Sequence, residues 1–123
     1  ELVKNSEILS LHIPLNDSTR NLYTAEVLEL MKNEAVLINT CRGGIVDERA
    51  LKARLSNGKL KAACMDTFAV EPPVDDELLT AENFLCTPHI GGSAEEARLA
   101  MGRAAIEGIE KNFVPIPGVF PFN

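Results

Sequence analysis

Residues that can move protons and bind carboxylates occur at three places in the 123-residue chain. His89 is a candidate general acid and base, because an imidazole with a reference pKa near 6.5 both donates and accepts protons close to neutral pH. Glu71 is the candidate carboxylate partner, which would orient the imidazole and favour its protonated form. Arg42 can hold a substrate carboxylate through two parallel hydrogen bonds.

Together, these three residues suit the transfer of hydride to or from an alcohol carbon. Oxidation of a secondary alcohol needs a base that removes the hydroxyl proton, and the reverse reduction needs the same group as an acid. A bidentate arginine would fix the carbon that exchanges hydride. Taken singly, each residue could be an ordinary surface side chain, so the prediction depends on a fold that brings them together.

Four short apolar runs are the candidate strands of that fold. They lie at 8–11, 35–38, 62–65 and 84–86. The runs are largely continuous rather than alternating, which is typical of parallel strands that helices cover on both faces.

Segments with helical spacing separate these runs. Thr24 can cap one helix and Asp47 can cap a second, while residues 76–80 can form only a turn or two. A capping box at 93–96 predicts a last helix that runs to about Asn112. We therefore predict an α/β fold, half of a doubly wound Rossmann-type parallel sheet with about four strands and flanking helices.

This fold would gather the candidate residues at one edge of the sheet. Ligands of open parallel sheets bind beyond the carboxyl ends of the strands, next to the amino termini of helices. The segments that directly follow the four runs are 12–14, 39–44, 66–68 and 87–92. They contain both histidines, Arg42 and two Gly-Gly pairs, so we expect a site at this edge.

The composition argues against several classes of function. Twelve Lys and Arg against 18 Asp and Glu give a net charge of −6 without a long basic block, which disfavours nucleic acid and anionic membranes as partners. No apolar stretch approaches the roughly 18 residues of a membrane span and no signal peptide is evident, so we expect a cytoplasmic protein. The three cysteines, Cys41, Cys64 and Cys86, are far apart, so we expect a reducing compartment and no metal site.

Several segments resemble the NAD-dependent D-isomer-specific 2-hydroxyacid dehydrogenases, most of all their phosphoglycerate dehydrogenase and glyoxylate/hydroxypyruvate reductase branch. They read MKNEAVLINTCRGGIVD from Met31, MDTFAVEPP from Met65 and TPHIGGSAEEA from Thr87. The segment SEILSLHIPLNDSTRNL from Ser6 is also similar to the family signature.

The resemblance implies a role for each matching residue. Arg42 would bind the substrate carboxylate, His89 would be the acid/base and Glu71 its carboxylate partner. Asp66 would meet the nicotinamide end of the cofactor. The remaining residues implied to line the cofactor cleft are His12, Ile13, Pro14, Thr19, Thr40, Cys41, Gly91 and Gly92.

The resemblance also implies ligands and partners. The cofactor would be NAD, with NADP left open, because the residue that selects between them belongs to the first half of a dinucleotide-binding domain. The substrate would be a small 2-hydroxy or 2-keto acid, and the protein would be a homo-oligomer.

The chain is expected to be only part of such an enzyme. Residues 1–112 would form the C-terminal half of a dinucleotide-binding domain, followed by an extended Pro- and Phe-rich tail at 113–123. The eight glycines contain no Gly-x-Gly pair, so the phosphate-binding fingerprint is missing and the isolated chain is expected to be inactive. The strand at 8–11 would then be an unpaired edge through which the chain associates with itself.

Two other classes of function remain open. The chain could be a non-catalytic nucleotide-binding or regulatory module, although three intact catalytic matches disfavour a pure sensor. Alternatively, Cys41 could act as a nucleophile with His89, because its thiol adjoins Arg42 and a helix start, which can lower a thiol pKa.

Overall fold

The computed structural model describes residues 1–110 of the chain. Residues 1–91 form one compact unit, and a second unit begins at Gly92. The predicted tail at 113–123, and the end of the last helix near Asn112, lie outside the described residues.

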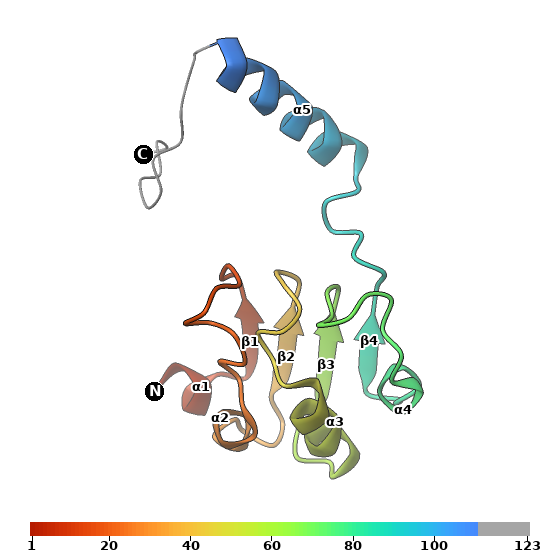
Figure 1. Cartoon of the computed structure of the whole chain (residues 1–123). Coiled ribbons are helices and arrows are strands. Elements are labelled where there is room, and N and C mark those ends of the chain that lie inside the picture. Colours follow the sequence, from red (N-terminus) through yellow and green to blue (C-terminus); the bar gives the residue numbers. More distant parts are fainter. Residues whose placement is uncertain (111–123) are drawn as a thin grey trace. The chain divides into compact units, whose positions relative to one another are not determined.

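Residues 1–91 are built around a four-stranded parallel sheet (Figure 1). Its strands are β1 (Ile8–Leu11), β2 (Val36–Asn39), β3 (Ala62–Met65) and β4 (Phe84–Cys86). Each strand pairs with the next one in the chain, in the order β1-β2-β3-β4, so the sheet grows in one direction. The predicted strands and the predicted α/β class are confirmed.

The helices of residues 1–91 are short. They are α1 (Leu2–Asn5), α2 (Ala25–Glu29), α3 (Glu48–Ser56) and α4 (Asp76–Leu79). Of these, α2 and α3 begin at the caps that the sequence predicts. The side chains of Thr24, Asp47 and Asp75 accept hydrogen bonds from amides in the first turns of α2, α3 and α4. These caps satisfy donors that have no partner inside the helix.

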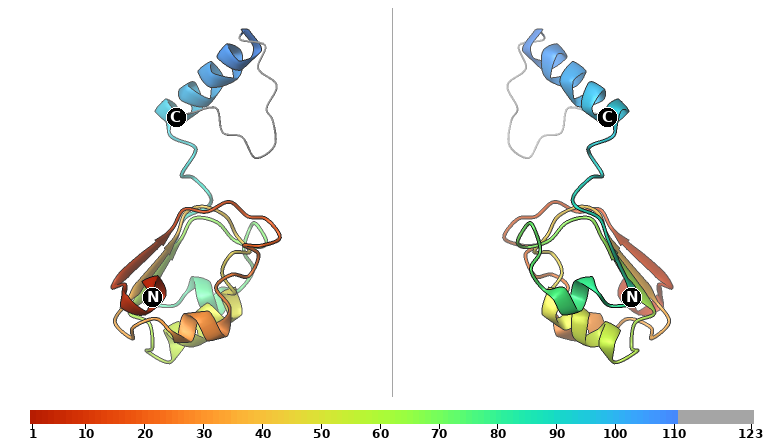
Figure 2. Two further views of the ribbon diagram at one scale, coloured as in Figure 1. Left: turned by 90° about the vertical axis from the view of Figure 1, so that its left-hand side faces the viewer. Right: turned by 90° about the vertical axis from the view of Figure 1, so that its right-hand side faces the viewer.

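The helices α2 and α3 lie on the same side of the sheet, as both views of Figure 2 show. On that face Leu9 and Leu37 are buried, whereas Ile8 and Leu85 on the opposite face are 66% and 64% exposed. The prediction that helices cover both faces is therefore wrong for residues 1–91. Right-handed crossovers that all advance in one direction place their helices on one face, which explains the difference.

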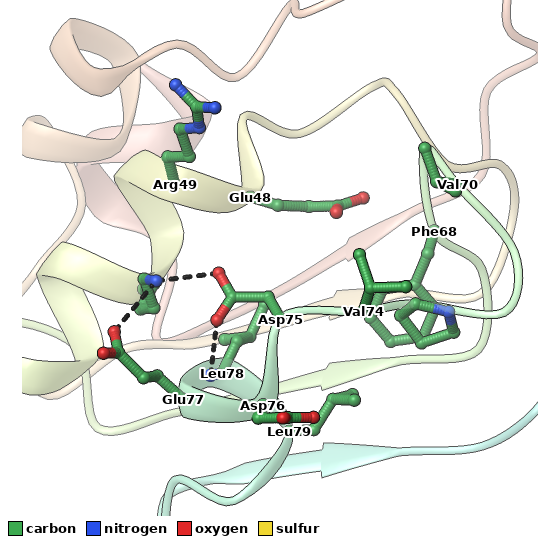
Figure 3. A pocket seen from close by; sticks show the side chains of 12 residues that line it. Glu48, Arg49, Phe68, Val70, Val74, Asp75, Asp76, Glu77, Leu78 and Leu79 are labelled. Atoms are coloured by element: carbon green, nitrogen blue, oxygen red, sulfur yellow. Dashed lines mark hydrogen bonds and ion pairs between the residues drawn. The ribbon is translucent and has the colours of Figure 1, made fainter.

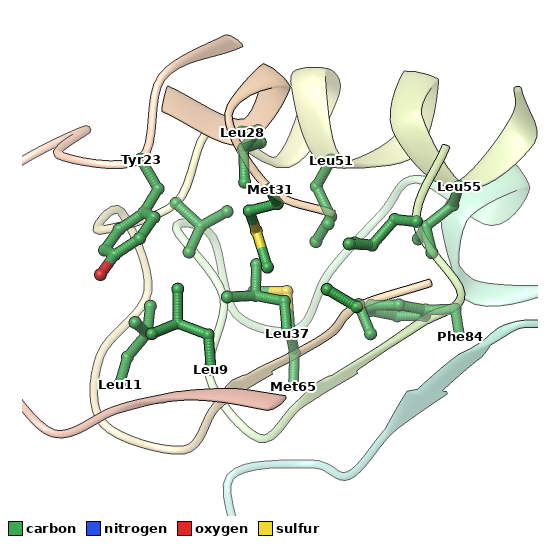
Figure 4. Packing of buried hydrophobic residues seen from close by; sticks show 14 of the residues in the cluster. Leu9, Leu11, Tyr23, Leu28, Met31, Leu37, Leu51, Leu55, Met65 and Phe84 are labelled. Atoms are coloured by element: carbon green, nitrogen blue, oxygen red, sulfur yellow. The ribbon is translucent and has the colours of Figure 1, made fainter. Parts of the chain in front are cut away.

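The hydrophobic core lies between this face and the helices (Figure 4). Leu9 of β1 and Leu37 of β2 are buried there together with Leu28 of α2 and Leu51 of α3. Burial of each such side chain stabilises the fold by about 1.5 to 3 kcal/mol. The strands thus form a packed platform for the loops beyond their carboxyl ends.

The charged side chain of Arg54 is buried beside this core. Arg54 of α3 is 4% exposed, and its Nη2 donates to the carbonyl oxygens of Met31 at 3.1 Å and Lys59 at 2.6 Å. Its Nη1 also forms an ion pair with Glu29 of α2 at 3.2 Å. Arg54 therefore joins the end of α2 to the turn that precedes β3.

Replacing Arg54 by alanine is expected to lower the free energy of unfolding by about 2 to 3 kcal/mol, because two carbonyl groups lose their buried donor. The control is Arg49→Ala, since Arg49 lies on the same helix but is exposed, and its loss should stay within about 0.5 kcal/mol. Urea unfolding measures both variants. Equal losses would show that Arg54 acts only as a surface charge.

The second unit contains the helix α5 (Glu95–Glu110). It begins within the predicted capping box at 93–96 and continues to the last described residue. Across residues 1–110, none of the helices combines the length and the apolar character that crossing a membrane requires.

Candidate active site

The carboxyl ends of the four strands lie at the same edge of the sheet, as predicted (Figure 1). His12 follows β1, Arg42 lies beyond the end of β2, Asp66 follows β3 and His89 lies beyond β4. Glu71, in the loop between β3 and α4, reaches the same edge because its side chain contacts His89. The fold therefore unites the predicted acid–base pair.

The imidazole of His89 is paired with Glu71. Its Nδ1 lies 2.8 Å from Oε2 of Glu71, a hydrogen-bond distance. The side chains of His89 and Glu71 are 45% and 38% exposed, so a ligand can reach the pair from solvent. With Nδ1 engaged, Nε2 is the ring nitrogen that remains available to exchange a proton with a substrate.

The carboxylate of Glu71 is held at both of its oxygens. While Oε2 contacts His89, Oε1 accepts a hydrogen bond of 2.9 Å from the backbone amide of Phe68. The hydrogen bond with His89 and the one from Phe68 lower the pKa of Glu71, so it is a carboxylate at neutral pH. Glu71 thus presents a fixed negative charge to the imidazole.

The backbone at His89 is in the left-handed region, with φ of 54°. This conformation costs a residue other than glycine about 1 to 2 kcal/mol, so surrounding contacts must hold it. Asp66 supplies them: its Oδ1 accepts the amide of Ile90 at 2.8 Å and the hydroxyl of Thr87, and its Oδ2 accepts the amide of Gly91 at 2.9 Å. Asp66 therefore shapes the loop that carries His89.

The ionisation of Asp66 couples this loop to pH. Burial opposes its charge, but hydrogen bonds from Thr87, Gly91 and Ile90 prevail and hold the pKa of Asp66 below its ordinary value of 3.8. A carboxyl with a depressed pKa in the folded state stabilises the fold above its unfolded pKa, and this contribution is lost as the pH falls through the folded pKa.

We therefore expect the free energy of unfolding to be higher for wild type than for Asp66→Asn, with the largest difference above about pH 5. The difference should shrink as the pH falls below the ordinary Asp value of 3.8. Urea unfolding at about pH 7, 5 and 3 measures it. Asp17→Asn is the control, because it changes an exposed loop carboxyl. The difference in unfolding free energy between wild type and Asp17→Asn should not shrink in this way as the pH falls. A gap for Asp66→Asn that stays constant down to pH 3 would disprove the coupling.

The loop that carries Arg42 depends on a residue that the sequence analysis missed. Asn39, the last residue of β2, is fully buried, and its Nδ2 donates to the carbonyl oxygen of Arg42 at 2.9 Å. Its Oδ1 accepts the amide of Cys41 at 3.2 Å. The available signal was a polar residue at the end of an otherwise apolar strand, where a buried amide must find partners in the next loop.

The thiol of Cys41 also donates to Oδ1 of Asn39, at 3.1 Å. The side-chain oxygen of Asn39 thus binds both the backbone amide and the thiol of Cys41. The side chain of Arg42 is exposed. Within residues 1–110, its guanidinium makes one hydrogen bond, from Nη1 to the carbonyl oxygen of Cys41 at 2.8 Å. Its other donors can therefore face a ligand.

Most residues predicted for the cofactor cleft surround one open pocket of about 480 Å³. It lies beyond β1 and β2 and is lined by His12, Ile13, Pro14, Leu15, Thr40, Cys41 and Arg42. Its lining combines apolar side chains such as Ile13 with hydrogen-bonding groups such as Thr40 and Arg42, which fits a dinucleotide with its flat rings and polar ribose and phosphate groups. Within residues 1–110, no cluster of three His, Cys, Asp or Glu side chains could hold a metal ion.

Four of the nine predicted cofactor residues lie elsewhere, and one of them is Asp66, in the loop contacts described above. Thr19 stabilises its own turn, because its hydroxyl donates to the carbonyl oxygen of Pro14 at 2.7 Å. Gly91 lies against Asp66, where an added Cβ would come within 3.0 Å of Oδ2. Gly92 begins the second compact unit.

A second pocket, of about 330 Å³, adjoins the acid–base pair. It is lined by Asp66, Phe68, Glu71, Pro72, Pro73, Pro88 and His89. The pair thus combines an oriented imidazole, a fixed carboxylate and largely apolar surroundings, which is an arrangement suited to general acid–base chemistry.

Residues 1–91 match the family model described as "D-isomer specific 2-hydroxyacid dehydrogenase, NAD binding domain". The match covers the sheet, the acid–base pair and the loop of Arg42.

Curated relatives agree with this match. The chain is 45% identical over 111 residues to a D-3-phosphoglycerate dehydrogenase of Methanocaldococcus jannaschii, and 44% identical over 115 residues to a hydroxypyruvate reductase of Thermotoga maritima. The alignments cover 90% and 91% of this chain but only 21% and 37% of the two relatives. The chain thus spans between about a fifth and two fifths of their length.

Solved structures are similar as well. An acyclic imino acid reductase in complex with NADPH and D-Arg has a TM-score of 0.83 and 39% identity, covering 90% of this chain and 36% of that chain. D-lactate dehydrogenase with NAD⁺ from Lactobacillus jensenii has a TM-score of 0.78 and 32% identity, covering 86% and 36%. By sequence and fold, the chain belongs to the NAD-binding domain family of the D-isomer-specific 2-hydroxyacid dehydrogenases.

Proposed function

We propose that this chain carries the acid–base and carboxylate-binding groups of an NAD(P)-dependent oxidoreductase that acts on D-2-hydroxy acids and 2-keto acids. The observation that supports this most directly is the contact of 2.8 Å between Nδ1 of His89 and Glu71, at the same sheet edge as Arg42. The family membership gives the class of reaction, and the relatives' names give the class of substrate.

In the proposed reaction, His89 moves the proton and Arg42 fixes the substrate. During oxidation, Nε2 of His89 takes the proton of the hydroxyl group while a hydride leaves the carbon that bears this group, so that the alcohol becomes a ketone. A bound nicotinamide cofactor would supply the acceptor for that hydride. The carboxylate of Glu71 stabilises the imidazolium that forms, and in the reverse direction this imidazolium donates its proton to the ketone oxygen.

The open pocket beyond β1 and β2 supports a dinucleotide site. His12, Ile13, Pro14, Thr40 and Cys41 would contact the cofactor there. We propose NAD as the cofactor and test NADP beside it, because the solved relatives were determined with NAD⁺ and with NADPH.

Residues 1–112 would be the C-terminal half of the dinucleotide-binding domain, in a homo-oligomer of the whole protein. In the isolated chain, β1 supports association, because it is an edge of the sheet within residues 1–91 and its Ile8 is 66% exposed. The free thiols of Cys41, Cys64 and Cys86 fit a cytoplasmic protein. Light scattering should give a mass above that of one chain at tens of micromolar, and a monomer would contradict the association.

A chimeric protein tests the proposed function. Residues 1–112 of this chain replace the matching segment of the Thermotoga maritima hydroxypyruvate reductase, which is 44% identical to it. We expect the chimera to oxidise NADH or NADPH with hydroxypyruvate, and Arg42→Ala to raise KM for the keto acid by about 10²-fold, since a charged hydrogen-bonded pair is lost. A folded chimera that binds NADH but turns over no keto acid would support a nucleotide-binding module instead.

A further inference from the structure

We propose that Glu48 is a positioning residue that fixes the His89–Glu71 pair from the start of α3. The inference deepens the proposed function and rests on it for the role of the pair. Glu48 lies outside the residues that the sequence analysis assigned to the site.

The contact that carries the proposal joins α3 to the loop of Glu71. Oε1 of Glu48 accepts a hydrogen bond of 2.7 Å from the backbone amide of Ala69. Figure 3 shows the Glu48 side chain extending from the first turn of α3 toward the loop that bears Phe68 and Val70. The residue also forms part of the wall of a pocket of about 760 Å³ between α3 and α4.

Two consecutive amides of this loop are bound by two different carboxylates. The amide of Phe68 donates to Oε1 of Glu71 at 2.9 Å, and the next amide, of Ala69, donates to Glu48. Because Oε2 of Glu71 holds Nδ1 of His89, the chain of contacts runs from Glu48 through the loop to the imidazole. All three hydrogen bonds in this chain of contacts involve a carboxylate oxygen, and a charged acceptor makes a hydrogen bond shorter and stronger.

The helix itself does not need this carboxylate. Asp47 already caps α3 by accepting the amides of Arg49 and Ala50, both at 3.0 Å. Glu48 is instead held in an unfavourable electrostatic position, since burial raises its pKa and the nearby carboxylates, including Glu71, add to this effect. Its hydrogen bond from Ala69 offsets part of this cost and fixes the direction of the side chain.

The backbone on the other side of the loop restricts it further. Gly43 lies so close that a Cβ there would come within 1.9 Å of the carbonyl of Phe68 and 2.5 Å of the nitrogen of Ala69. The Phe68–Ala69 peptide is therefore clamped between the segment of Arg42 and the side chain of Glu48. This clamp holds the backbone beside Arg42 against the loop that bears Glu71.

The tautomer of His89 reports on the pair without any turnover. A neutral imidazole that donates Nδ1–H to Glu71 must leave Nε2 unprotonated, whereas an imidazole without such an acceptor favours Nε2–H. The full chain contains only His12 and His89, so ¹⁵N NMR of the labelled chain at about pH 9 resolves both rings, and His12→Ala assigns them.

We expect wild type to show Nδ1–H at His89, and Glu48→Asp and Glu48→Ala to shift the major form to Nε2–H and to weaken the hydrogen bond of the Ala69 amide. Glu48→Asp keeps the charge and shortens the reach by one CH₂ group. Glu48→Gln keeps an acceptor oxygen and should retain the wild-type tautomer. Glu77→Ala removes the same charge from an exposed position on the wall of the same pocket and should also retain it.

Retention of Nδ1–H in Glu48→Asp or Glu48→Ala after loss of the Ala69 hydrogen bond would overturn the proposal. If both Glu48→Asp and Glu48→Ala fail to fold, the proposal is also overturned, because the role of Glu48 would then be to stabilise the fold. An inactive chimera with the expected tautomer shifts would reject the proposed function while the positioning role stands.

Discussion

Replacing His89 by alanine is expected to lower kcat of the chimeric reductase by a factor of about 10² to 10⁴, the usual contribution of a positioned general acid or base. The loss should fall on kcat rather than on KM for the keto acid, because Arg42 still holds the substrate carboxylate. Steady-state kinetics with NADH and hydroxypyruvate measure both constants. The pH dependence that a titrating imidazole gives to kcat/KM should disappear with the side chain.

His12→Ala is the matched comparison, since it removes the chain's other imidazole from the same sheet edge. Nε2 of His12 lies 2.8 Å from the hydroxyl of Ser10, so this ring has a local partner and no carboxylate contact among the described residues. Its loss should act mainly on cofactor binding and leave the pH profile intact. Equal losses of kcat in the two variants would show that His89 is not the specific proton carrier.

Much of the fold follows from local sequence signals. Apolar runs predicted the strands, and the caps at Thr24 and Asp47 predicted where α2 and α3 begin, because capping is a contact between residues two or three positions apart. The coverage of the sheet could not be predicted in this way. Ile8 and Leu85 are apolar but exposed, and the face that a strand residue occupies depends on the direction of every crossover.

The site shows the same division between local and distant contacts. His89, Arg42 and Asp66 could be predicted to share an edge, because parallel strands bring their carboxyl ends together. The contacts of Asn39 with the loop of Arg42 span only three residues and were within reach of a pattern argument. The contact of Glu48 with the amide of Ala69 spans 21 residues and requires the packed structure.

Gly43→Ala is expected to lower the free energy of unfolding by about 3 kcal/mol, the upper range for overpacking a close contact. The new Cβ would lie 1.9 Å from both the carbonyl carbon and the carbonyl oxygen of Phe68, and backbone atoms cannot turn aside as a flexible side chain could. The two segments must therefore move apart, which separates Arg42 from the acid–base pair. In the chimera this should cost about 10²-fold in kcat/KM, since a shift of roughly 1 Å is enough to misalign reacting groups.

Gly44→Ala separates this packing effect from a backbone effect, because the neighbouring glycine has a left-handed backbone but space for a Cβ. Gly44 has φ of +74°, but an added Cβ would meet nothing nearer than 3.9 Å. Its replacement should cost only about 1 kcal/mol, for the left-handed backbone. Urea unfolding compares the two variants, and a smaller loss for Gly43→Ala than for Gly44→Ala would mean that the Arg42 segment does not clamp the Phe68–Ala69 peptide. A larger loss at Gly43 would tie the rigidity of the site to the close approach of two backbones.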